Sequence, residues 1–455
     1  MGEAPIGCRK AQIMNPSTGG DVYCLPHAHG GYLIYAPLAG RVAHVNAACA
    51  IQIRRFLISG DPREVPSEVA GRLGGLAWLK TAQVPRPLPA DRHFHPCEVT
   101  LFLTNRCNLR CRYCYAAAGD KRPLDMPLDT MRAAINLVAR NARLAGRAMH
   151  VGFHGGGEPT QNGAALEAAV AYARETAAAE GTGPVQFYIA TNGVMTAPQR
   201  EFVASECAAI NLSLDGPPDI HDAARPTTAG GGSFDAVMAF VEVLRRHKRA
   251  FSIRSTITAA NVARMTEMVA YFHQSTECRL LHFEPAFAGG RCRNDGTAVP
   301  GWAEFASEFI KAHDEARRRG IELRFSASRL EQPSFCFCGC ANDPFTVTPE
   351  GFVTACYEVC DGLNPRAEQY IFGRHHPDGF HFDYPKLARL RKLTVDNKPF
   401  CRFCFAKWVC AGDCPIKAHH PYAEAASASP RCKATQRILR SLLERVAVNP
   451  EHKSN

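Results

Sequence analysis

The sequence predicts an α/β fold, because short β-rich runs alternate with amphipathic stretches in its middle and a cysteine-rich region follows. The expected strands are residues 98–103, 149–153, 185–190, 210–214, 251–257 and 279–284. The helices expected between them are residues 128–145, 164–179, 197–206, 233–247 and 262–273. Strands and helices in this alternation imply βα units with parallel crossovers. A chain of 455 residues has room for about three domains.

The first 95 residues follow a different pattern. Residues 21–43 alternate as in a β-hairpin or a small sheet, and residues 46–58 and 66–81 each predict a helix. A short sheet followed by helices resembles a winged-helix module. We therefore expect residues 1–95 to form a small N-terminal α+β module.

Three closely spaced cysteines, Cys107, Cys111 and Cys114, come directly after the first strand of the α/β region. Three thiolates can hold three corners of a four-iron cluster, whereas the usual protein-bound cluster takes four cysteines. The iron without a thiolate can then bind a substrate or cofactor, as the open position of a catalytic zinc site does. A zinc or structural site with the same spacing is the alternative.

A second group of cysteines lies near the C-terminus. Cys340 is followed by ten residues, Gly351, four residues and Cys356. Farther along the chain come Cys401, Cys404, Cys410, Cys414 and Cys432. Pairs of the type Cys-x2-Cys also bind zinc, so two zinc ribbons are the alternative to iron–sulfur clusters.

The first cysteine motif resembles the signature of the radical S-adenosylmethionine (SAM) superfamily, because an aromatic residue, Tyr113, precedes its last cysteine. The resemblance implies a partial (β/α)6 TIM-like barrel over residues 97–325, with Tyr113 among the cofactor-binding residues. It also implies a four-iron cluster whose open iron binds SAM and whose electron cleaves it. The resulting 5'-deoxyadenosyl radical removes a hydrogen atom from a substrate.

A glycine-rich segment follows the second expected strand, where such barrels carry their chemistry. Glycines let backbone carbonyls approach an ammonium group closely. The segment resembles the family motif that contacts the methionine amino group of SAM, which makes its members candidate cofactor-binding residues: Gly155, Gly156, Gly157 and Glu158.

Further candidates lie on the fourth and fifth expected strands. Arg254 can bind the methionine carboxylate through a bidentate fork, or it is a wall arginine paired with a glutamate. Ser213 and Asp215 can bond the ribose hydroxyls, although Asp215-Gly216 is also typical of a turn. The following loop, residues 221–234, resembles a segment that lies near the substrate and the nucleoside in SPASM enzymes.

The C-terminal cysteine order resembles the SPASM extension of radical SAM enzymes that modify peptides. The extension, expected over residues 326–448, implies two auxiliary four-iron clusters. The first is assigned to Cys340, Cys356 and Cys414, and the second to Cys401, Cys404, Cys410 and Cys432. Cys336 is favoured over Cys338 as the fourth ligand of the first cluster, because one residue between Cys338 and Cys340 leaves little chain to wrap a cluster. Cys360 is a further candidate.

Three functions are compatible with these motifs. The first is a maturase that installs a thioether, a carbon–carbon crosslink or another change in a ribosomally made peptide or protein. The second is a formylglycine-forming enzyme of the anaerobic sulfatase-maturase type, in which an aspartate base follows the cysteine that is here Cys356. This chain has Tyr357-Glu358 instead, so the candidate catalytic residues are Tyr357, Glu358 and Asp413. The third is a non-catalytic iron–sulfur electron carrier.

The expected cofactors are three four-iron clusters and SAM, and the expected partners are a peptide or protein substrate and a donor such as flavodoxin or ferredoxin. The N-terminal module resembles, in addition, an element that binds a leader peptide as an added strand, and a plain extension that only covers the barrel is the alternative. The net charge of +10 falls to about +5 once three clusters are bound. With no basic stripe, signal peptide or long apolar run, we expect a cytoplasmic protein that binds neither nucleic acid nor membrane.

Overall fold

The computed structural model describes residues 12–13, 21–80, 84–85, 87–89, 92–417 and 429–448. The chain divides into two compact units. One unit contains residues 1–87, 326–337 and 393–455, and the other, which we call the barrel unit, contains residues 88–325 and 338–392.

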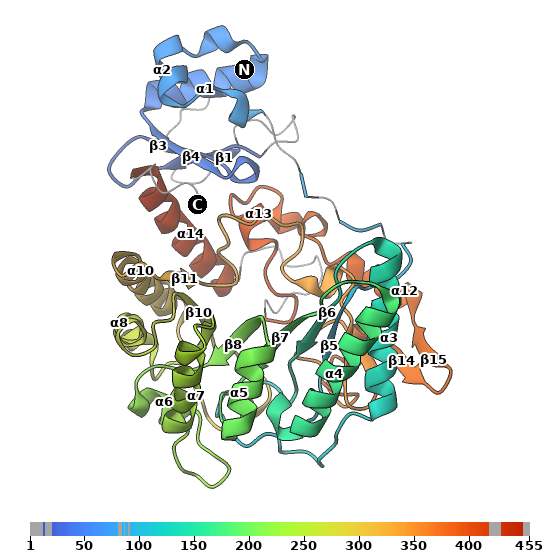
Figure 1. Cartoon of the computed structure of the whole chain (residues 1–455). Helices are drawn as coiled ribbons and strands as arrows, with labels where there is room; N and C mark the ends of the chain where they lie inside the picture. The colour runs from blue at the N-terminus through green and yellow to red at the C-terminus, as the bar shows by residue number, and fades with distance from the viewer. Residues whose placement is uncertain are drawn as a thin grey trace. The chain divides into compact units, whose positions relative to one another are not determined.

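Parallel strands form the centre of the barrel unit (Figure 1). They lie side by side in chain order: β5 (Glu98–Leu101), β6 (His150–Phe153), β7 (Gln186–Thr191), β8 (Ala209–Ser213), β9 (Ser252–Ile257), β10 (Leu280–Pro285) and β11 (Glu322–Arg324). The register pairs Val99 with Val151 and Leu212 with Ile253, so apolar side chains of neighbouring strands fall on the same face. The predicted parallel α/β fold is confirmed, and each of the six expected strands is present.

Helices connect these strands and pack against them (Figure 1). They are α3 (Leu128–Ala145), α4 (Gly163–Glu180), α5 (Ala197–Glu206), α6 (Pro218–Ala224), α7 (Phe234–Arg246), α8 (Met265–Ser275), α9 (Arg291–Asn294) and α10 (Trp302–Arg318). Helix α3 buries Met131, Ile135 and Val138 along one side, because residues three and four apart share a helix face. It ends at Gly146, whose φ of 59° closes the last turn. All five expected helices are confirmed to within a few residues.

The sheet continues beyond β5 on its other edge. Strand β12 (Thr346–Val347) pairs with β5 in parallel, and β13 (Phe352–Thr354), β14 (Ile371–His376) and β15 (Gly379–Phe382) follow as an antiparallel meander. Two short helices, α11 (Ala367–Tyr370) and α12 (Tyr384–Arg391), belong to the same segment. The pairing of β12 with β5 brings the loop that begins at Cys356 to the barrel strands.

The other unit contains an antiparallel sheet of β1 (Gln12–Ile13), β2 (Tyr23–Pro26), β3 (Tyr32–Ala36) and β4 (Arg41–Val45). Helices α1 (Ala47–Ser59), α2 (Ser67–Arg72), α13 (Lys407–Cys410) and α14 (Pro430–Val448) complete it. The expected α+β arrangement is present, but the helix expected over residues 66–81 is wrong in length. Helix α2 ends at Arg72 because Gly74 and Gly75 adopt φ values of 64° and 89°, and only a 3-10 turn, Ala77–Leu79, follows.

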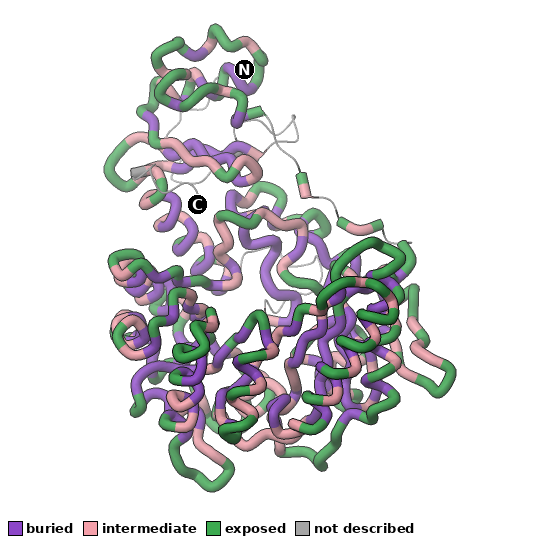
Figure 2. Tube along the Cα trace, in the orientation of Figure 1, coloured by how far each residue is buried: buried purple, intermediate pink, exposed green. Residues whose placement is uncertain are grey.

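Burial follows this architecture, as the purple strands of the barrel unit in Figure 2 show. Val99, Val151, Ile189, Leu212 and Ile253 are fully buried. Within the described residues, no helix combines the length and the apolar character needed to cross a bilayer.

Candidate active site

The three cysteines of the first motif lie on the loop that leaves the C-terminal end of β5. Each sulfur accepts a hydrogen bond from a different donor. The backbone N–H groups of Leu109 and Ala118 point at Cys107 Sγ and Cys114 Sγ, both at 3.5 Å, and Arg225 Nη1 lies 3.9 Å from Cys111 Sγ. Hydrogen bonds to sulfur are typical of thiolates that ligate iron–sulfur clusters.

Burial raises the pKa of Cys107 to about 12 and that of Cys111 to about 11. The neighbouring thiols raise both values further, since ionised sulfurs would repel one another. These thiols are therefore protonated at neutral pH until a metal displaces their protons. The donor set, three thiols each with its own hydrogen-bond donor, fits a four-iron cluster with one open iron.

Arg291, at the start of α9, holds the cysteine loop through several hydrogen bonds. Its backbone N–H donates to Cys114 O at 2.9 Å, and its guanidinium donates to Cys111 O at 2.8 Å and to Ala118 O at 2.9 Å. An ion pair with Asp120 fixes the same guanidinium. Sequence reasoning missed this residue, because Arg291 is far from the cysteines in the chain and lies in no motif.

The glycine-rich loop after β6 contacts the cysteine loop through its backbone. A Cβ on Gly157 would lie 2.3 Å from Arg106 O and 2.7 Å from Thr104 O, so only glycine fits. The Glu158 N–H donates to the same Arg106 carbonyl at 2.8 Å. The two loops predicted to bind the cluster and SAM therefore lie against each other.

The carboxylate of Glu158 is buried and bonded to protein. It accepts hydrogen bonds from Thr160 Oγ1 at 2.9 Å, Thr191 Oγ1 at 2.7 Å and the Asn192 N–H at 2.7 Å. Burial raises the pKa of Glu158, while these hydrogen bonds lower it. Asn192 Nδ2 in turn donates to Asn108 Oδ1 at 2.9 Å. Glu158 thus ties the ends of β6 and β7 to the cysteine loop.

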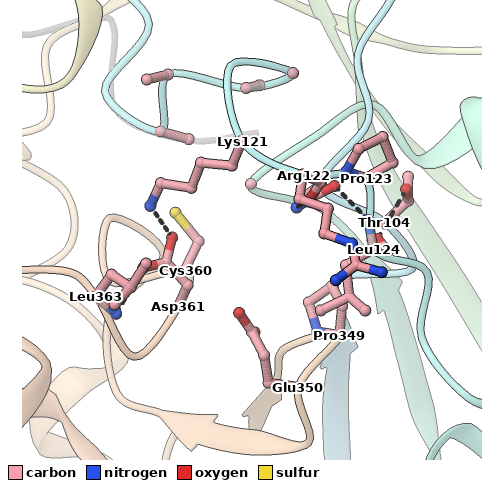
Figure 3. Close-up of a pocket in the computed structure, with 16 residues that line it drawn as sticks. Thr104, Lys121, Arg122, Pro123, Leu124, Pro349, Glu350, Cys360, Asp361 and Leu363 are labelled. Carbon is pink, nitrogen blue, oxygen red and sulfur yellow. Dashed lines mark hydrogen bonds and ion pairs between the residues drawn. The ribbon is translucent and has the colours of Figure 1, made fainter.

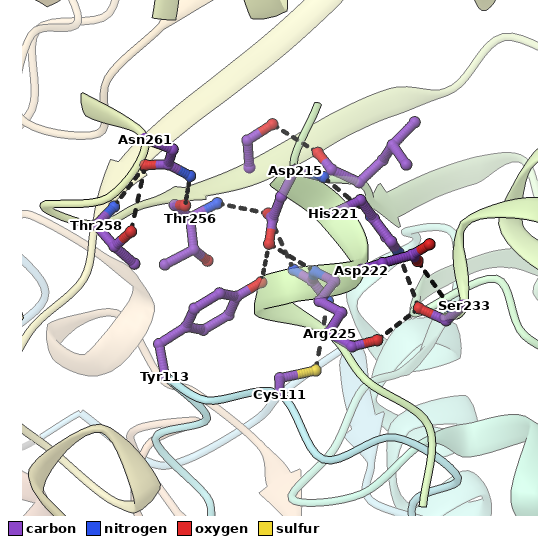
Figure 4. A network of polar contacts seen from close by, with 12 residues as sticks. Cys111, Tyr113, Asp215, His221, Asp222, Arg225, Ser233, Thr256, Thr258 and Asn261 are labelled. Carbon is purple, nitrogen blue, oxygen red and sulfur yellow. Dashed lines mark hydrogen bonds and ion pairs between the residues drawn. The ribbon is translucent and has the colours of Figure 1, made fainter. Parts of the chain in front are cut away.

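Asp215, which follows β8, is the centre of a polar network (Figure 4). Its fully buried carboxylate accepts bonds from the Tyr113 hydroxyl, from Arg225 Nε at 2.9 Å and from the Thr256 N–H at 2.9 Å. Its own N–H donates to His221 Nδ1 at 3.3 Å. Three protein donors thus bond the carboxylate of Asp215, which the sequence offered either as a ribose ligand or as part of a turn.

Ser213 and Arg254 lie opposite each other in the register of β8 and β9. Arg254 is exposed, and its Nη1 donates to His282 Nδ1 at 3.1 Å. His282 Nε2 lies 3.0 Å from Glu284 Oε1 on the same strand, β10. A guanidinium has five N–H donors, so Arg254 can keep this bond and still bind a carboxylate.

Tyr357 meets the inner side of strands β5 to β7. Its hydroxyl lies 3.1 Å from Thr100 Oγ1, which in turn lies 2.6 Å from the Tyr188 hydroxyl. Tyr188 donates to Glu98 Oε1 at 2.7 Å. The Tyr357 ring also lies against the His154 ring, with centroids 4.5 Å apart. Burial raises the pKa of Tyr357, so its phenol stays protonated at neutral pH.

A cavity of about 500 Å³ lies beside the glycine loop (Figure 3). Gly156 and Cys360 are among its lining residues, as are Lys121 and Asp361, which form an ion pair. A Cβ on Gly156 would lie 2.9 Å from the Cβ of Cys360. The loop after Cys356 thus reaches the glycine loop, and it carries Glu358, whose backbone carbonyl accepts a hydrogen bond from Asn364 Nδ2 at 2.8 Å.

The four cysteines expected to hold the second auxiliary cluster all line one small cavity of about 40 Å³: Cys401, Cys404, Cys410 and Cys432. Burial raises the pKa of Cys401 to about 12 and that of Cys410 well above its ordinary value. Gln436 Nε2 donates to Cys404 Sγ at 3.3 Å. These thiols form a set that fits one four-iron cluster.

A single metal ion would require its ligands to converge on one point. In the described ranges, no three His, Cys, Asp or Glu side chains are placed in this way. A four-iron cluster binds each thiolate at a different iron, so its ligands do not converge.

The ligands expected for the first auxiliary cluster belong to both units. Cys336 and Cys414 are buried in one unit, while Cys340 and Cys356 belong to the barrel unit. Of the alternative ligands, Cys338 is exposed and Cys360 is buried.

Asp413 precedes Cys414 and is buried. Arg431 Nε donates to both of its carboxylate oxygens, at 2.8 and 2.7 Å, and the Cys414 N–H donates to Oδ1 at 2.7 Å. This pairing is typical of a carboxylate that orders a loop, so the geometry favours a structural role for Asp413 over a role as base.

Residues 101–259 match the model of the Radical SAM superfamily. Among curated proteins, the mycofactocin maturase MftC of Mycolicibacterium smegmatis is 30% identical over 270 residues, covering 57% of this chain and 64% of the relative. A cysteine-type anaerobic sulfatase-maturating enzyme of Clostridium novyi is 27% identical over 190 residues, covering 40% of this chain and 49% of the relative. The chain spans from about half to two thirds of the length of the first curated relatives that it matches.

Solved structures share the fold. One is described as native anSMEcpe with bound AdoMet and Cp18Cys peptide, with a TM-score of 0.61 and 18% identity over 78% of this chain and 99% of that chain. Another is Streptococcus suis SuiB bound to precursor peptide SuiA, with a TM-score of 0.52 and 12% identity over 89% of this chain and 96% of that chain. At these identities the likeness establishes the fold alone.

Proposed function

Since residues 101–259 of this chain match the model of the Radical SAM superfamily, we propose that the protein is a maturase that abstracts a hydrogen atom from a peptide or protein substrate. The observation that carries the proposal is the trio of thiols, each with its own hydrogen-bond donor, beside a glycine loop that admits no Cβ. Relatives named as maturases and a structural neighbour bound to a precursor peptide support a peptide substrate.

Cys107, Cys111 and Cys114 would hold the SAM-binding cluster. The bound cluster supplies one electron, whose transfer to SAM starts hydrogen abstraction. In this proposal the carbonyls of the glycine loop receive the methionine ammonium group, and the accessible guanidinium of Arg254 receives its carboxylate. Ser213, at the end of β8, would bond a ribose hydroxyl.

Two auxiliary clusters complete the proposal. The second is supported by the four cysteines that line one cavity, Cys401, Cys404, Cys410 and Cys432. The first would be held by Cys340, Cys356 and Cys414 with Cys336 as the fourth ligand. Together they would accept the electron left after a crosslink forms or bind a group of the substrate, and a donor such as flavodoxin or ferredoxin would reduce the protein.

Tyr357 and Glu358 are the proposed catalytic residues at the substrate. Because burial keeps the Tyr357 phenol protonated, it can donate a hydrogen bond to a substrate carbonyl but does not serve as a base. Glu358, the next residue, is the proposed proton acceptor. Thr100 and the His154 ring hold the Tyr357 side chain at the inner side of the strands.

We expect Tyr357→Phe to lower substrate modification about 100-fold, the contribution typical of one general acid–base group. The ring contact with His154 would remain, so release of 5'-deoxyadenosine would continue while product formation falls. Tyr172→Phe is the matched control, because its hydroxyl bonds Asn136 between two outer helices. Mass spectrometry of the peptide and quantitation of the nucleoside separate the two effects, and unchanged product formation in Tyr357→Phe would remove this residue from the site.

The N-terminal sheet suggests how a leader segment would bind. In the described part of this sheet, β4 is an outer strand that pairs only with β3, and four of its five residues are at least partly accessible. An outer strand offers unpaired backbone groups to an added strand. We therefore propose the edge of β4 as the leader site, and the precursor peptide should slow hydrogen exchange of the β4 amides.

The central test is anaerobic release of 5'-deoxyadenosine from SAM by the reduced, reconstituted protein. We expect about 12 iron atoms in the parent and about 8 in a variant with all three cysteines of the first motif changed to Ala, at four per cluster. Cys49→Ala, on α1 and outside every cluster motif, is the control and should keep all the iron.

Release by the parent and not by the triple variant supports the radical chemistry. Full iron without release, even with candidate peptides added, points to an electron carrier. A formylglycine product in a sulfatase-derived peptide would instead identify the sulfatase-maturase type.

A further inference from the structure

Arg225 comes directly after α6, in a stretch that runs antiparallel to the cysteine loop. The Arg110 N–H donates to Pro226 O at 2.7 Å, the Arg112 N–H to Ala224 O at 3.0 Å, and the Thr228 N–H to Asn108 O at 3.1 Å. Residues 224–228 are thus fixed along residues 108–112. Arg225 and Cys111 lie opposite each other between the first two of these bonds, and their side chains meet.

The guanidinium of Arg225 has three partners in this arrangement (Figure 4). Its Nε lies 2.9 Å from Asp215 Oδ2, its Nη1 lies 3.9 Å from Cys111 Sγ, and its carbon lies 5.3 Å from the centre of the Tyr113 ring. The ion pair is almost dry, since the Arg225 side chain is 8% exposed and that of Asp215 is not exposed. Charges so far from solvent are weakly screened.

The surrounding residues hold Arg225 in this place. Asp222 accepts from the N–H groups of Ser233 and Phe234, both at 2.8 Å. Ser233 Oγ donates to Arg225 O at 2.6 Å and contacts His221 Nε2 at 2.9 Å. A loop with this many internal bonds keeps the guanidinium from swinging away from Cys111.

We infer that Arg225 is a positioning residue that sets the reduction potential of the cluster held by Cys107, Cys111 and Cys114, with Asp215 as its counter-charge. This inference rests on the proposed function, because it needs that cluster. Reduction adds a negative charge to a cluster, and a nearby cation with a hydrogen bond to a ligand sulfur favours the reduced state. Asp215, a buried anion at the same place, opposes it.

The two charges make opposite predictions. Arg225→Gln removes the cation and should lower the ratio of reduced to oxidised cluster about tenfold at a fixed poise, which is about 59 mV for one electron. Asp215→Asn removes the anion and should raise this ratio. Arg225→Lys keeps the positive charge but not the planar guanidinium. Its ratio of reduced to oxidised cluster should lie between those of Arg225→Gln and the parent.

The measurement is a redox titration of the reconstituted protein followed by electron paramagnetic resonance, with iron content determined for each variant. The signal of this cluster is the one that SAM alters and that the triple cysteine variant lacks. Arg112→Gln is the matched control, because it neighbours Cys111 in the chain but its side chain is 56% exposed; its ratio should change less than about twofold, since exposed charges are screened.

Opposite shifts in Arg225→Gln and Asp215→Asn, at parent iron content, are the expected result. Shifts of the same sign, no shift in either variant, or loss of the cluster from both would overturn the inference, because a purely structural role then suffices. If Arg225→Gln alone loses its iron, Asp215→Asn is the deciding variant. A ratio of reduced to oxidised cluster that does not rise in Asp215→Asn would then overturn the inference. A parent protein that binds no iron on the first motif would instead refute the proposed function.

Discussion

At the scale of single residues, Gly157 shows how a backbone contact constrains the sequence. A Cβ there would meet three backbone atoms of residues 104–106 within 2.7 Å, and no side chain can move aside to relieve the overlap. We expect Gly157→Ala to lower the free energy of unfolding by about 1–3 kcal/mol, as overpacking does, and to weaken binding of SAM. Urea unfolding and a SAM binding assay measure the two effects.

Gly71→Ala is the control for this prediction. Gly71 lies in α2, and a Cβ built on it meets no atom within 4 Å. Alanine should therefore be neutral or stabilise the protein by about 0.5–1 kcal/mol. Equal losses in both variants would show that the contact of Gly157 with the cysteine loop is unimportant.

His221 makes a prediction about pH at the same scale. Burial, assisted by the neighbouring Arg225, lowers the pKa of His221 to about 4, whereas the unfolded chain keeps a value near 6.5. Below pH 6.5 the unfolded state binds a proton at this histidine that the folded state does not bind. The contribution of His221 to the free energy of unfolding is therefore complete above pH 6.5 and is lost as the pH falls towards 4. Between pH 7 and 5.5 the loss is about 1 kcal/mol.

The measurement compares the free energy of unfolding of the parent and of His221→Gln at pH 7 and pH 5.5. Acid damage to clusters affects both proteins, so the difference between their pH slopes isolates the histidine. We expect the variant to lose about 1 kcal/mol less than the parent over this range. Parallel slopes would contradict the assignment of a neutral, buried His221.

At the scale of elements, the ion pair between Arg431 and Asp413 joins helix α14 to the loop that carries Cys414. Both side chains are at most 2% exposed. Arg431→Met leaves Asp413 buried without its cation and should cost about 3–5 kcal/mol. Adding Asp413→Asn should recover part of this loss, because an amide carries no charge and asparagine tolerates the φ of 62° at this position.

The control for this prediction is Glu444→Gln on the same helix. Its pair with Arg440 is partly exposed, with atoms 3.7 Å apart, and such a pair contributes about 0–1 kcal/mol. Denaturant unfolding of the reconstituted proteins measures all three variants. A double variant no more stable than Arg431→Met would argue that packing of the arginine, and not its charge, is what matters.

At the scale of the whole molecule, the proposed clusters should differ in how readily they lose iron. The cysteines of the first motif are half-buried and supply three ligands, whereas Cys401 and Cys410 are buried members of a set of four. During titration with a chelator, we expect the SAM-sensitive signal to vanish while about 8 of about 12 iron atoms remain. SAM should slow this step by occupying the open iron. Earlier loss of the other iron would contradict the assignment of the open site.

The sequence alone determined the order of strands and helices, because hydrophobic periodicity is a local property that each element carries in its own residues. It also marked the cysteines, the glycine loop and Asp215, since these residue types stand where strands end. The helix expected over residues 66–81 failed for a local reason as well, the pair Gly74-Gly75.

The tertiary structure alone decided which distant residues meet. Arg225 and Arg291 lie 114 and 180 residues from Cys111, and no spacing in the chain could bring either of them to its sulfur or its carbonyl. The pairing of β12 with β5, which carries Tyr357 to Thr100 and His154, likewise depends on strands far apart in the chain. Such contacts form between surfaces that several elements build together, and a pattern read along one segment does not contain them.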